Sequence, residues 1–410
     1  MTKSALSQTK GPVDPITTSN VLSDDTEWAK RADYWGSQKP PKPRNHAGRK
    51  DRQPLILSGH GVRLSVDHGA LLIQNGFTHY PQEREEWRLF PGDRQLPSRI
   101  VILDSSGSLS FDVMTWLSTK DIPLVQINWQ GEVITMLGGP GHSADSKKVA
   151  AQREALQNGQ GLRIAIQLIR DKIKGCMETL EQVLPASLER ERALTKQAKA
   201  LTVLDGDPPS TMETLRLIEG RAALAYFTAW QTIPLRWKGI GKHPIPDEWL
   251  RVGLRQSSLS GTNRHATHPV NALLNYAYGL LETEVRIAVV AAGLDPTIGY
   301  LHAQRPGRVA FVYDLMEPLR PMVDQEVLRF VQKHIFSRGD FVMTNSGACR
   351  LHPDLARSIS ARLLQRLPKV AISTTVTTVS PLPKAGTRHK NITQRLLNLP
   401  VGYMQLVLLL

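Results

Sequence analysis

A carboxylate at Glu219 lies within the apolar face of a helix that the residue pattern predicts over residues 212–233. At helical spacing, one stripe of this helix carries Leu215, Glu219, Ala222, Tyr226 and Trp230. Burying an unpaired charge costs free energy, so the carboxylate should find a cation, find a hydrogen-bond donor or take up a proton. An internal ion pair with Arg216 or Arg221 is the simplest structural explanation.

A histidine and two acids lie close together in the second half of the chain. His302 follows a turn, and Asp314 and Glu317 have the i,i+3 spacing that lets two side chains share a helical face. Pro318 is typical of a helix start, so we expect Glu317 near the beginning of the next helix. Together with Glu219, these groups predict a site for Mg²⁺ or Mn²⁺, because carboxylate oxygens suit both ions and an imidazole favours Mn²⁺. The alternative is a turn histidine beside two helix-capping acids.

A third group of residues is basic and is predicted to contact DNA. Its members are Arg236, Lys238, Lys242, Arg264, Arg305 and Arg308. The first four are interleaved with Trp237, a mixture that suits phosphate contact and base stacking. The last two belong to a flexible connector that contains Gly307. A solvated surface run is the alternative for the first four.

The composition favours a polyanionic partner. The 410 residues include 51 Lys+Arg and 37 Asp+Glu, which gives a formal net charge of +14. The two cysteines cannot build a disulfide framework or a four-ligand zinc site by themselves. No apolar run approaches the ~18 residues of a membrane span, and residues 1–15 lack the apolar run of a signal peptide. We therefore expect a cytoplasmic protein that does not bind membranes.

The elements that must position these groups form a β-rich part followed by a helical part. Alternating apolar residues predict strands around residues 55–57, 62–66, 71–73, 99–103, 124–129 and 133–136. Ser110 is expected to cap a short helix ending at Thr119. Helical periodicity predicts further helices over residues 150–184, 187–204, 212–233, 269–292, 323–336 and 354–367. The expected class is α+β, with a small, β-sandwich-like domain before a larger all-α domain.

Four regions are predicted along the chain. Residues 1–53 contain many prolines and no sustained periodicity, so we expect a disordered or irregular tail. Residues 54–141 form the β-rich domain, which ends in a glycine-rich linker. Residues 142–370 form the α-helical domain that carries the predicted metal site. Residues 371–410 are expected to be an irregular C-terminal tail.

Six blocks of sequence occur in an order that points to a known family. They are Gly61-Val62-Arg63-Leu64-Ser65, Asp121-Ile122-Pro123-Leu124-Val125, Ile218-Glu219-Gly220-Arg221-Ala222-Ala223, Pro269-Val270-Asn271-Ala272-Leu273-Leu274-Asn275-Tyr276, Gly293-Leu294-Asp295-Pro296 with Gly299, Leu301 and His302, and Asp314-Leu315-Met316-Glu317-Pro318-Leu319-Arg320-Pro321. With these blocks the chain resembles the Cas-one proteins, the CRISPR-associated endonuclease/integrase family. The resemblance covers roughly residues 53–370.

The resemblance implies roles for four residues. Glu219, His302 and Glu317 match the family's divalent-metal ligands, and Asp314 matches an additional acid that is sometimes counted as catalytic. It implies a metal-dependent endonuclease/integrase of CRISPR adaptation, which inserts short foreign DNA fragments by attack of a 3′-hydroxyl on a phosphate. It also implies double-stranded and branched DNA as substrates, a homodimer formed by the β-rich domain, and a partnership with a Cas-two protein dimer.

Two other functions stay open from the sequence. A stand-alone relative outside CRISPR could act as a transposon-type integrase or as a branched-DNA repair nuclease. A DNA-binding scaffold with an inactive site is the third possibility, although each expected ligand position holds a competent residue.

Overall fold

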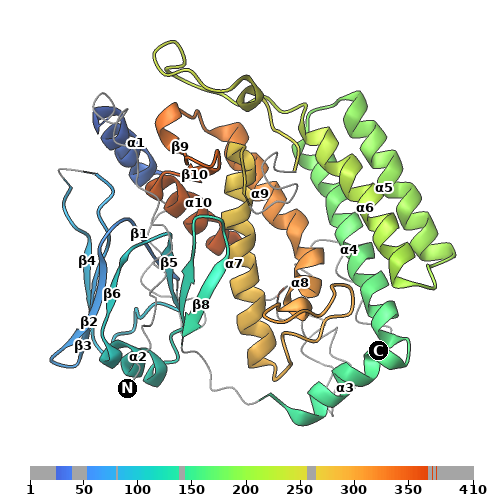
Figure 1. Cartoon of the computed structure of the whole chain (residues 1–410), viewed down its shortest axis with the longest axis horizontal. Coiled ribbons are helices and arrows are strands. Elements are labelled where there is room, and N and C mark those ends of the chain that lie inside the picture. Colours follow the sequence, from blue (N-terminus) through green and yellow to red (C-terminus); the bar gives the residue numbers. More distant parts are fainter. Residues whose placement is uncertain are drawn as a thin grey trace, which may run out of the picture.

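In the computed structural model, the N-terminal strands lie on one side of a long central helix, α7 (Pro269–Ala291), and a group of helices lies on the other (Figure 1). The structure describes residues 25–38, 53–79, 82–137, 144–255 and 265–367, together with residues 372 and 375. The arrangement confirms the predicted mixed α+β class, with sheets first and helices after them. Among the described residues, we find no helix whose length and apolar character together would let it cross a lipid bilayer.

Two four-stranded sheets form the N-terminal part. The first has the order β1-β5-β7-β8, with β1 (Leu55–Ser58), β5 (Ile100–Leu103), β7 (Leu124–Ile127) and β8 (Val133–Leu137). The second has the order β4-β3-β2-β6, with β4 (Glu86–Leu89), β3 (Ala70–Gln74), β2 (Val62–Asp67) and β6 (Gly107–Leu109). The predicted hairpins β2–β3 and β7–β8 are confirmed, whereas β4 and β6 were not predicted. Helix α2 (Phe111–Thr119) follows Ser110, whose side chain makes no capping hydrogen bond.

The first sheet contributes to two hydrophobic cores. On β5, Val101 and Leu103 belong to the large core around α7, whereas Ile100 packs with the second sheet and α2. On β7, Val125 and Leu124 divide in the same way. Successive side chains of a strand point to opposite faces, so a strand covered on both faces is apolar at consecutive positions. The large core thus includes residues on both sides of the predicted boundary at 141–142, which stays a prediction.

The turn between β7 and β8 packs directly on α7. Gly131 lies in this turn with φ +80°, a conformation that favours glycine. A Cβ on Gly131 would overlap the backbone of Asn275, and a Cβ on Gly279 would overlap the backbone of Gly131. These two glycines allow the closest approach of the sheet to the central helix.

The α-helices from α3 to α10 make up most of the helical part. They are α3 (Ser146–Gln157), α4 (Gln160–Val183), α5 (Leu188–Gly206), α6 (Met212–Trp230), α7, α8 (Ala310–Met316), α9 (Arg320–Lys333) and α10 (Pro353–Arg366). Short 3₁₀ segments are η3 (Asp247–Leu250), η4 (Glu317–Leu319) and η5 (Arg338–Asp340). The helix predicted over residues 150–184 is in fact two helices. They separate at Gly159, whose φ of +78° is incompatible with a continuous helix.

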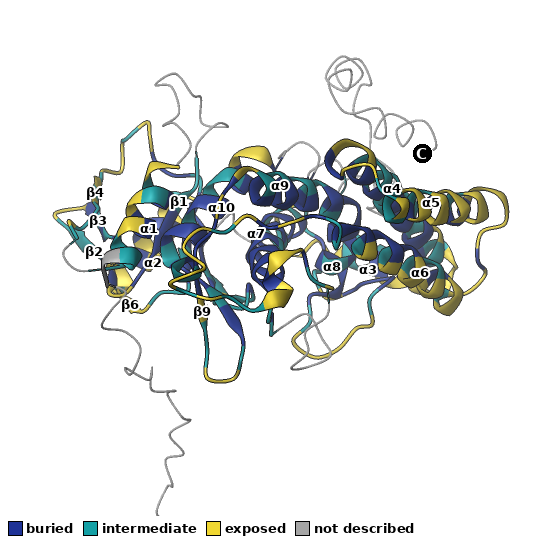
Figure 2. Ribbon diagram, turned by 90° about the horizontal axis from the view of Figure 1, so that it is seen from above, coloured by how far each residue is buried: buried dark blue, intermediate teal, exposed yellow. Residues whose placement is uncertain are grey.

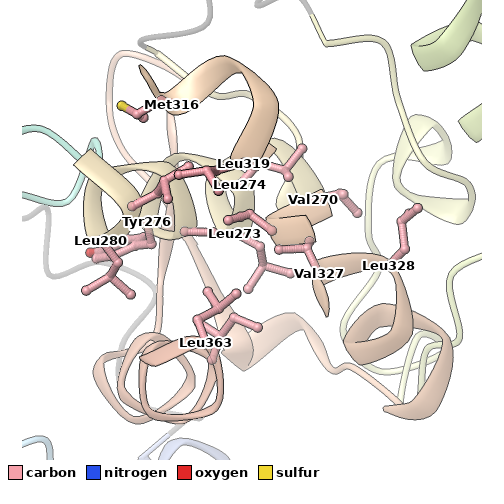
Figure 3. Packing of buried hydrophobic residues seen from close by; sticks show 14 of the residues in the cluster. Val270, Leu273, Leu274, Tyr276, Leu280, Met316, Leu319, Val327, Leu328 and Leu363 are labelled. Carbon is pink, nitrogen blue, oxygen red and sulfur yellow. The ribbon is translucent and has the colours of Figure 1, made fainter. Parts of the chain in front are cut away.

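Helix α7 forms the centre of the large core. The outer helices α5 and α6 expose one face to solvent, whereas α7 and α9 are mostly buried (Figure 2). On α7, Leu273, Leu274 and Leu280 are buried and pack among side chains of α9 and α10, including Val327 and Leu363 (Figure 3). A helix that is apolar on most of its surface is stable only where neighbours cover it, as they do around α7.

The prediction of an irregular N-terminal tail was wrong for one segment. Residues 25–37 fall within the predicted N-terminal tail, but they form α1 (Asp25–Ser37), which packs on α10 and η5. Arg31 of α1 pairs with Asp340 inside the protein, at an Nε–Oδ1 distance of 2.6 Å. The second part of the chain was predicted to be all-α, which is wrong in one place, because β9 (Phe341–Met343) and β10 (Cys349–Leu351) form a hairpin there. Helix α1 is too short to establish a helical period in a proline-rich part of the sequence. Asp340, the partner of its Arg31, lies about three hundred residues away.

Parts of the predictions lie outside the described residues. These parts are residues 1–24 and 39–52 of the predicted N-terminal tail, the linker at 138–141, Arg264, and residues 371–410 apart from 372 and 375.

Candidate metal centre

The three predicted metal ligands come from three separate elements and converge on one place. Glu219 lies in the middle of α6, His302 in the loop between α7 and α8, and Glu317 at the junction of α8 and η4. The His302 Nε2 atom is 3.7 Å from Glu317 Oε1. Lys172, on α4, forms ion pairs with both carboxylates, and its Nζ is 2.6 Å from Glu317 Oε2. The fold therefore brings two carboxylates to one ammonium and places the imidazole beside one of them, Glu317.

The predicted stripe on α6 faces the core, but its carboxylate lies at the edge. The apolar members of the stripe, such as Ala222 and Tyr226, are buried, while the Glu219 side chain keeps 25% of its surface exposed. Its cationic partner is Lys172, and not Arg216 or Arg221, the two partners considered from the sequence. Arg216 instead donates its Nε hydrogen to the Leu301 carbonyl at 3.0 Å and so holds the loop before His302.

Asp314 holds the loop that carries His302. Its carboxylate is fully buried and accepts hydrogen bonds from the backbone amides of Tyr300, Leu301 and His302. It also lies 2.8 Å from His302 Nδ1. Because a carboxylate accepts hydrogen bonds, a neutral ring in this position would carry its proton on Nδ1 and leave a lone pair on Nε2, the nitrogen that faces Glu317. Asp314 therefore orients the imidazole, and it does not cap a helix.

We expect that Asp314→Ala weakens the affinity of this site for Mn²⁺ by about 10–100-fold, because it frees the imidazole and the loop that presents it. The Asp314→Asn variant keeps one acceptor oxygen, so its loss should be smaller. Isothermal titration with MnCl₂ measures both affinities. Equal affinities for Asp314→Ala and the unaltered protein would show that the loop holds its position without this carboxylate.

Glu317 stays ionised because the charges around it outweigh its burial. Desolvation raises the pKa of Glu317, but the nearby Arg320, Lys172 and His302 lower it to about 2. Arg320 Nε lies 3.2 Å from Glu317 Oε1. For Lys172, burial lowers the pKa of the ammonium, whereas Glu317 and Glu219 raise it more strongly. Glu317 and Lys172 are therefore both charged at neutral pH.

The donor set has the chemistry that a hard divalent cation requires. Carboxylate oxygens and one imidazole nitrogen are ligands that Mg²⁺ and Mn²⁺ accept, and a cationic group already lies between the two carboxylates. Within the described ranges, no three metal-binding side chains are close enough to surround an ion as they stand. The ammonium of Lys172 lies between the two carboxylates, at the place where a metal ion bound by both would have to lie.

A small recess opens beside this centre. Its lining includes Lys172, Arg255 and Arg320, and also Asp324, which accepts hydrogen bonds from the hydroxyls of two tyrosines. Desolvation raises the pKa of Asp324 to about 6. Both guanidinium groups lie about 5 Å from the ring centre of Tyr278, at 5.3 Å for Arg255 and 5.0 Å for Arg320. Three cationic side chains in one recess can attract a phosphate group.

The predicted DNA-binding residues are scattered. Lys238, Lys242 and Arg305 are exposed, and Arg308 is half-buried in the loop that follows His302. Arg236 donates hydrogen bonds to the carbonyls at the end of α9, which is a structural role.

Trp237 does not stand ready to stack on a base. Its ring packs against Trp249 and Phe341, and its indole N–H donates to the Trp249 carbonyl at 2.9 Å. Sequence reasoning missed Lys172, Arg255 and Arg320 as members of the site, because isolated basic residues in a chain with 51 of them carry no signal.

The sequence of this chain matches a known protein family and its members. The profile of the family described as "CRISPR associated protein Cas1" matches residues 55–365. A curated relative, "CRISPR-associated endonuclease Cas1 1" of Archaeoglobus fulgidus, is 28% identical over 326 residues, which cover 76% of this chain and 88% of the relative.

Solved structures share the fold. One described as "Casposase bound to integration product" has a TM-score of 0.65 and 24% identity, and it covers 84% of this chain and 99% of that one. A chain of a "Cas6-RT-Cas1--Cas2 complex" has a TM-score of 0.61 and 17% identity, covering 83% of this chain and 35% of that one. Since the family profile spans well over half of the sequence, this chain belongs to the CRISPR associated protein Cas1 (Cas-one) family.

Proposed function

We propose that this protein is a metal-dependent DNA endonuclease/integrase of CRISPR adaptation, which inserts short foreign DNA fragments by 3′-hydroxyl transesterification. The single observation that carries the proposal is that Glu219 and Glu317 share one ammonium while the His302 ring lies 3.7 Å from Glu317, in a member of the Cas-one family. The name of the Archaeoglobus fulgidus relative, an endonuclease, and the casposase with its integration product support the same reaction class.

Glu219, His302 and Glu317 would hold Mg²⁺ or Mn²⁺, which would supply Lewis-acid activation of the attacking hydroxyl and offset charge on the phosphate. Around it, Asp314 keeps the His302 ring in one orientation and one tautomer. Arg320 keeps Glu317 ionised. The chain would therefore supply two acids from helical elements and an imidazole from a loop that Asp314 holds in place.

The reaction exchanges one phosphodiester bond for another. The 3′-oxygen of the incoming fragment forms a bond to the target phosphorus, and the bond from that phosphorus to the 3′-oxygen of the target strand breaks. The proton of the attacking hydroxyl leaves to solvent, and the departing 3′-oxygen takes one up. Lys172, Arg255 and Arg320 would attract the target phosphate to the recess. Water in place of the 3′-hydroxyl gives cleavage of double-stranded or branched DNA by the same route.

The proposed partners are a second copy of this chain and a Cas-two protein dimer. The homodimer would form through the β-rich part, where Phe111 of α2 keeps 87% of its surface exposed. Leu109 and Met114, close to it in the sequence, are also exposed, and a group of exposed apolar side chains is typical of an interaction surface. A Cas-two partner is supported by the similar chain in the complex that contains Cas2.

A transposon-type integrase outside CRISPR is the second candidate, because the casposase structure superimposes over 99% of its own chain. A branched-DNA repair nuclease would use the same site. The two integrases differ in their target. A CRISPR integrase should join fragments at the ends of a repeat in an array, whereas a transposon-type enzyme should not require a repeat.

The test is a joining reaction with labelled fragments that end in a 3′-hydroxyl or in a 3′-deoxy sugar, in MnCl₂ or in EDTA. We expect joined product only from the 3′-hydroxyl fragment in MnCl₂, since the 3′-deoxy end has no nucleophile. Joining by the 3′-deoxy fragment, or undiminished joining in EDTA, would reject the mechanism. A plasmid with a repeat array and one without it, used as targets, separate the two candidates.

A further inference from the structure

Lys172 lies between two acids and forms an ion pair with each. Its side chain keeps 13% of its surface exposed, and its ammonium contacts both Glu219 and Glu317, whose carboxylates come from α6 and η4. In the part of the chain that the structure describes, no other lysine or arginine forms ion pairs with both carboxylates. The ammonium therefore connects two elements that share no other ion pair at this place.

Helix α4 presents this lysine in a fixed position. Gly175, one turn further along, lies so close to Pro321 that an added Cβ would be 3.0 Å from the proline ring. The Thr179 hydroxyl lies 3.3 Å from the Pro321 carbonyl oxygen. Because α4 packs this tightly on the segment that carries Glu317, rotation of the Lys172 side chain separates the ammonium from the carboxylates at less cost than movement of the helix.

Two carboxylates that contact the same ammonium need a cation between them. Without one, Glu219 and Glu317 would repel each other, and Glu317, whose side chain is only 5% exposed, would have little water to solvate it. A divalent metal ion bound by the same oxygens would satisfy the same charges. The ammonium and the metal ion cannot both lie between the two carboxylates, because like charges at contact distance repel.

We propose that Lys172 is an internal counter-ion that competes with the divalent metal ion for Glu219 and Glu317, and that metal binding displaces it. This inference rests on the proposed function, since it takes these two acids as the metal ligands. It makes Lys172 a positioning residue that keeps the centre assembled without metal. It also implies that the centre binds metal more weakly than its ligands alone would allow.

The first experiment titrates MnCl₂ into the full-length protein without DNA and measures melting temperature in EDTA. Lys172→Met keeps most of the side-chain length but removes the charge. We expect Lys172→Met to bind Mn²⁺ about tenfold more tightly than the unaltered protein. One charge beside a carboxylate changes the binding equilibrium of that carboxylate by a factor of about ten. In EDTA this variant should melt a few degrees lower, and Mn²⁺ should raise its melting temperature by more.

Lys174→Met is the matched control, because it makes the same change on the same helix two residues away. It should bind Mn²⁺ as the unaltered protein does. Lys172→Arg keeps the charge and should bind Mn²⁺ no more tightly than the unaltered protein. Equal or weaker Mn²⁺ binding by Lys172→Met would overturn the counter-ion role while leaving the metal site in place. Absence of Mn²⁺ binding in every variant would overturn the metal site as well.

A second measurement uses the unaltered protein and so does not depend on the folding of a variant. Lysines are acetylated briefly with and without MnCl₂, and the modification of Lys172 and Lys174 is quantified by mass spectrometry. Displacement predicts that Mn²⁺ increases the acetylation of Lys172 severalfold and leaves that of Lys174 unchanged. Unchanged acetylation of Lys172 at saturating Mn²⁺ would contradict displacement.

Discussion

Glu219→Gln and Glu317→Gln should each lower the rates of DNA joining and cleavage by about 10³-fold. Glutamine keeps the size of the side chain but replaces an anionic oxygen with an amide group, so the metal ion loses a charged ligand. Lewis-acid activation by a bound metal ion contributes several kcal/mol, and each 1.36 kcal/mol corresponds to a factor of about ten in rate. Single-turnover assays with branched DNA in MnCl₂ measure the loss.

Glu213→Gln is the matched control for Glu219→Gln, because Glu213 is an exposed acid in the first turn of the same helix. It should keep the unaltered rate. Gel-shift assays should show that all three variants still bind DNA, since basic residues and not these acids attract the phosphates. A Glu219→Gln protein that joins DNA at the unaltered rate would remove this residue from the metal site.

The second large effect concerns stability. Arg31→Met should lower the free energy of unfolding by about 3–5 kcal/mol, the usual cost of leaving one partner of a buried ion pair alone. Asp340 is fully buried and accepts hydrogen bonds from Arg31 Nε at 2.6 Å, Arg31 Nη2 at 2.7 Å and Trp35 Nε1 at 2.7 Å. Without Arg31, the donors that remain to this carboxylate among the described residues are the indole of Trp35 and the amide of Ser337. Denaturant unfolding measures the change.

Lys30→Met is the control for this effect, because Lys30 is the neighbouring residue and is exposed. It should leave stability within about 0.5 kcal/mol, the usual range for exposed positions. The double variant Arg31→Met with Asp340→Asn should recover part of the loss, since the buried charge is gone. A loss below about 1 kcal/mol for Arg31→Met would mean that α1 is not anchored to the body in solution.

Local patterns carried much of the fold. Period-2 alternation located the β2–β3 and β7–β8 hairpins, and Pro269 with Gly293 marked the ends of α7. Such signals are readable because strand and helix periodicity, turns and caps depend on neighbouring residues. The three-residue strands β6 and β9 were missed because so few positions cannot establish a period.

The acids of the site show how far local reasoning reaches. Spacing placed Asp314 and Glu317 together, and the apolar stripe singled out Glu219. Spacing could not separate the two neighbouring acids, which turn out to differ. Asp314 points to the backbone of the loop, whereas Glu317 faces Lys172 and His302. That difference depends on how the loop before α8 folds back on the helix.

The chain's residue order was enough to assign its family, its mixed class and the acids and histidine at its centre, because those signals lie within short blocks. Only the folded molecule reveals that Lys172 lies between two of those acids, or that Arg31 meets Asp340. Those contacts join residues up to 309 positions apart, and they arise from the packing of α4 on η4 and of α1 on η5. Long-range packing selects one lysine or arginine among many that are chemically alike, and no local pattern distinguishes it.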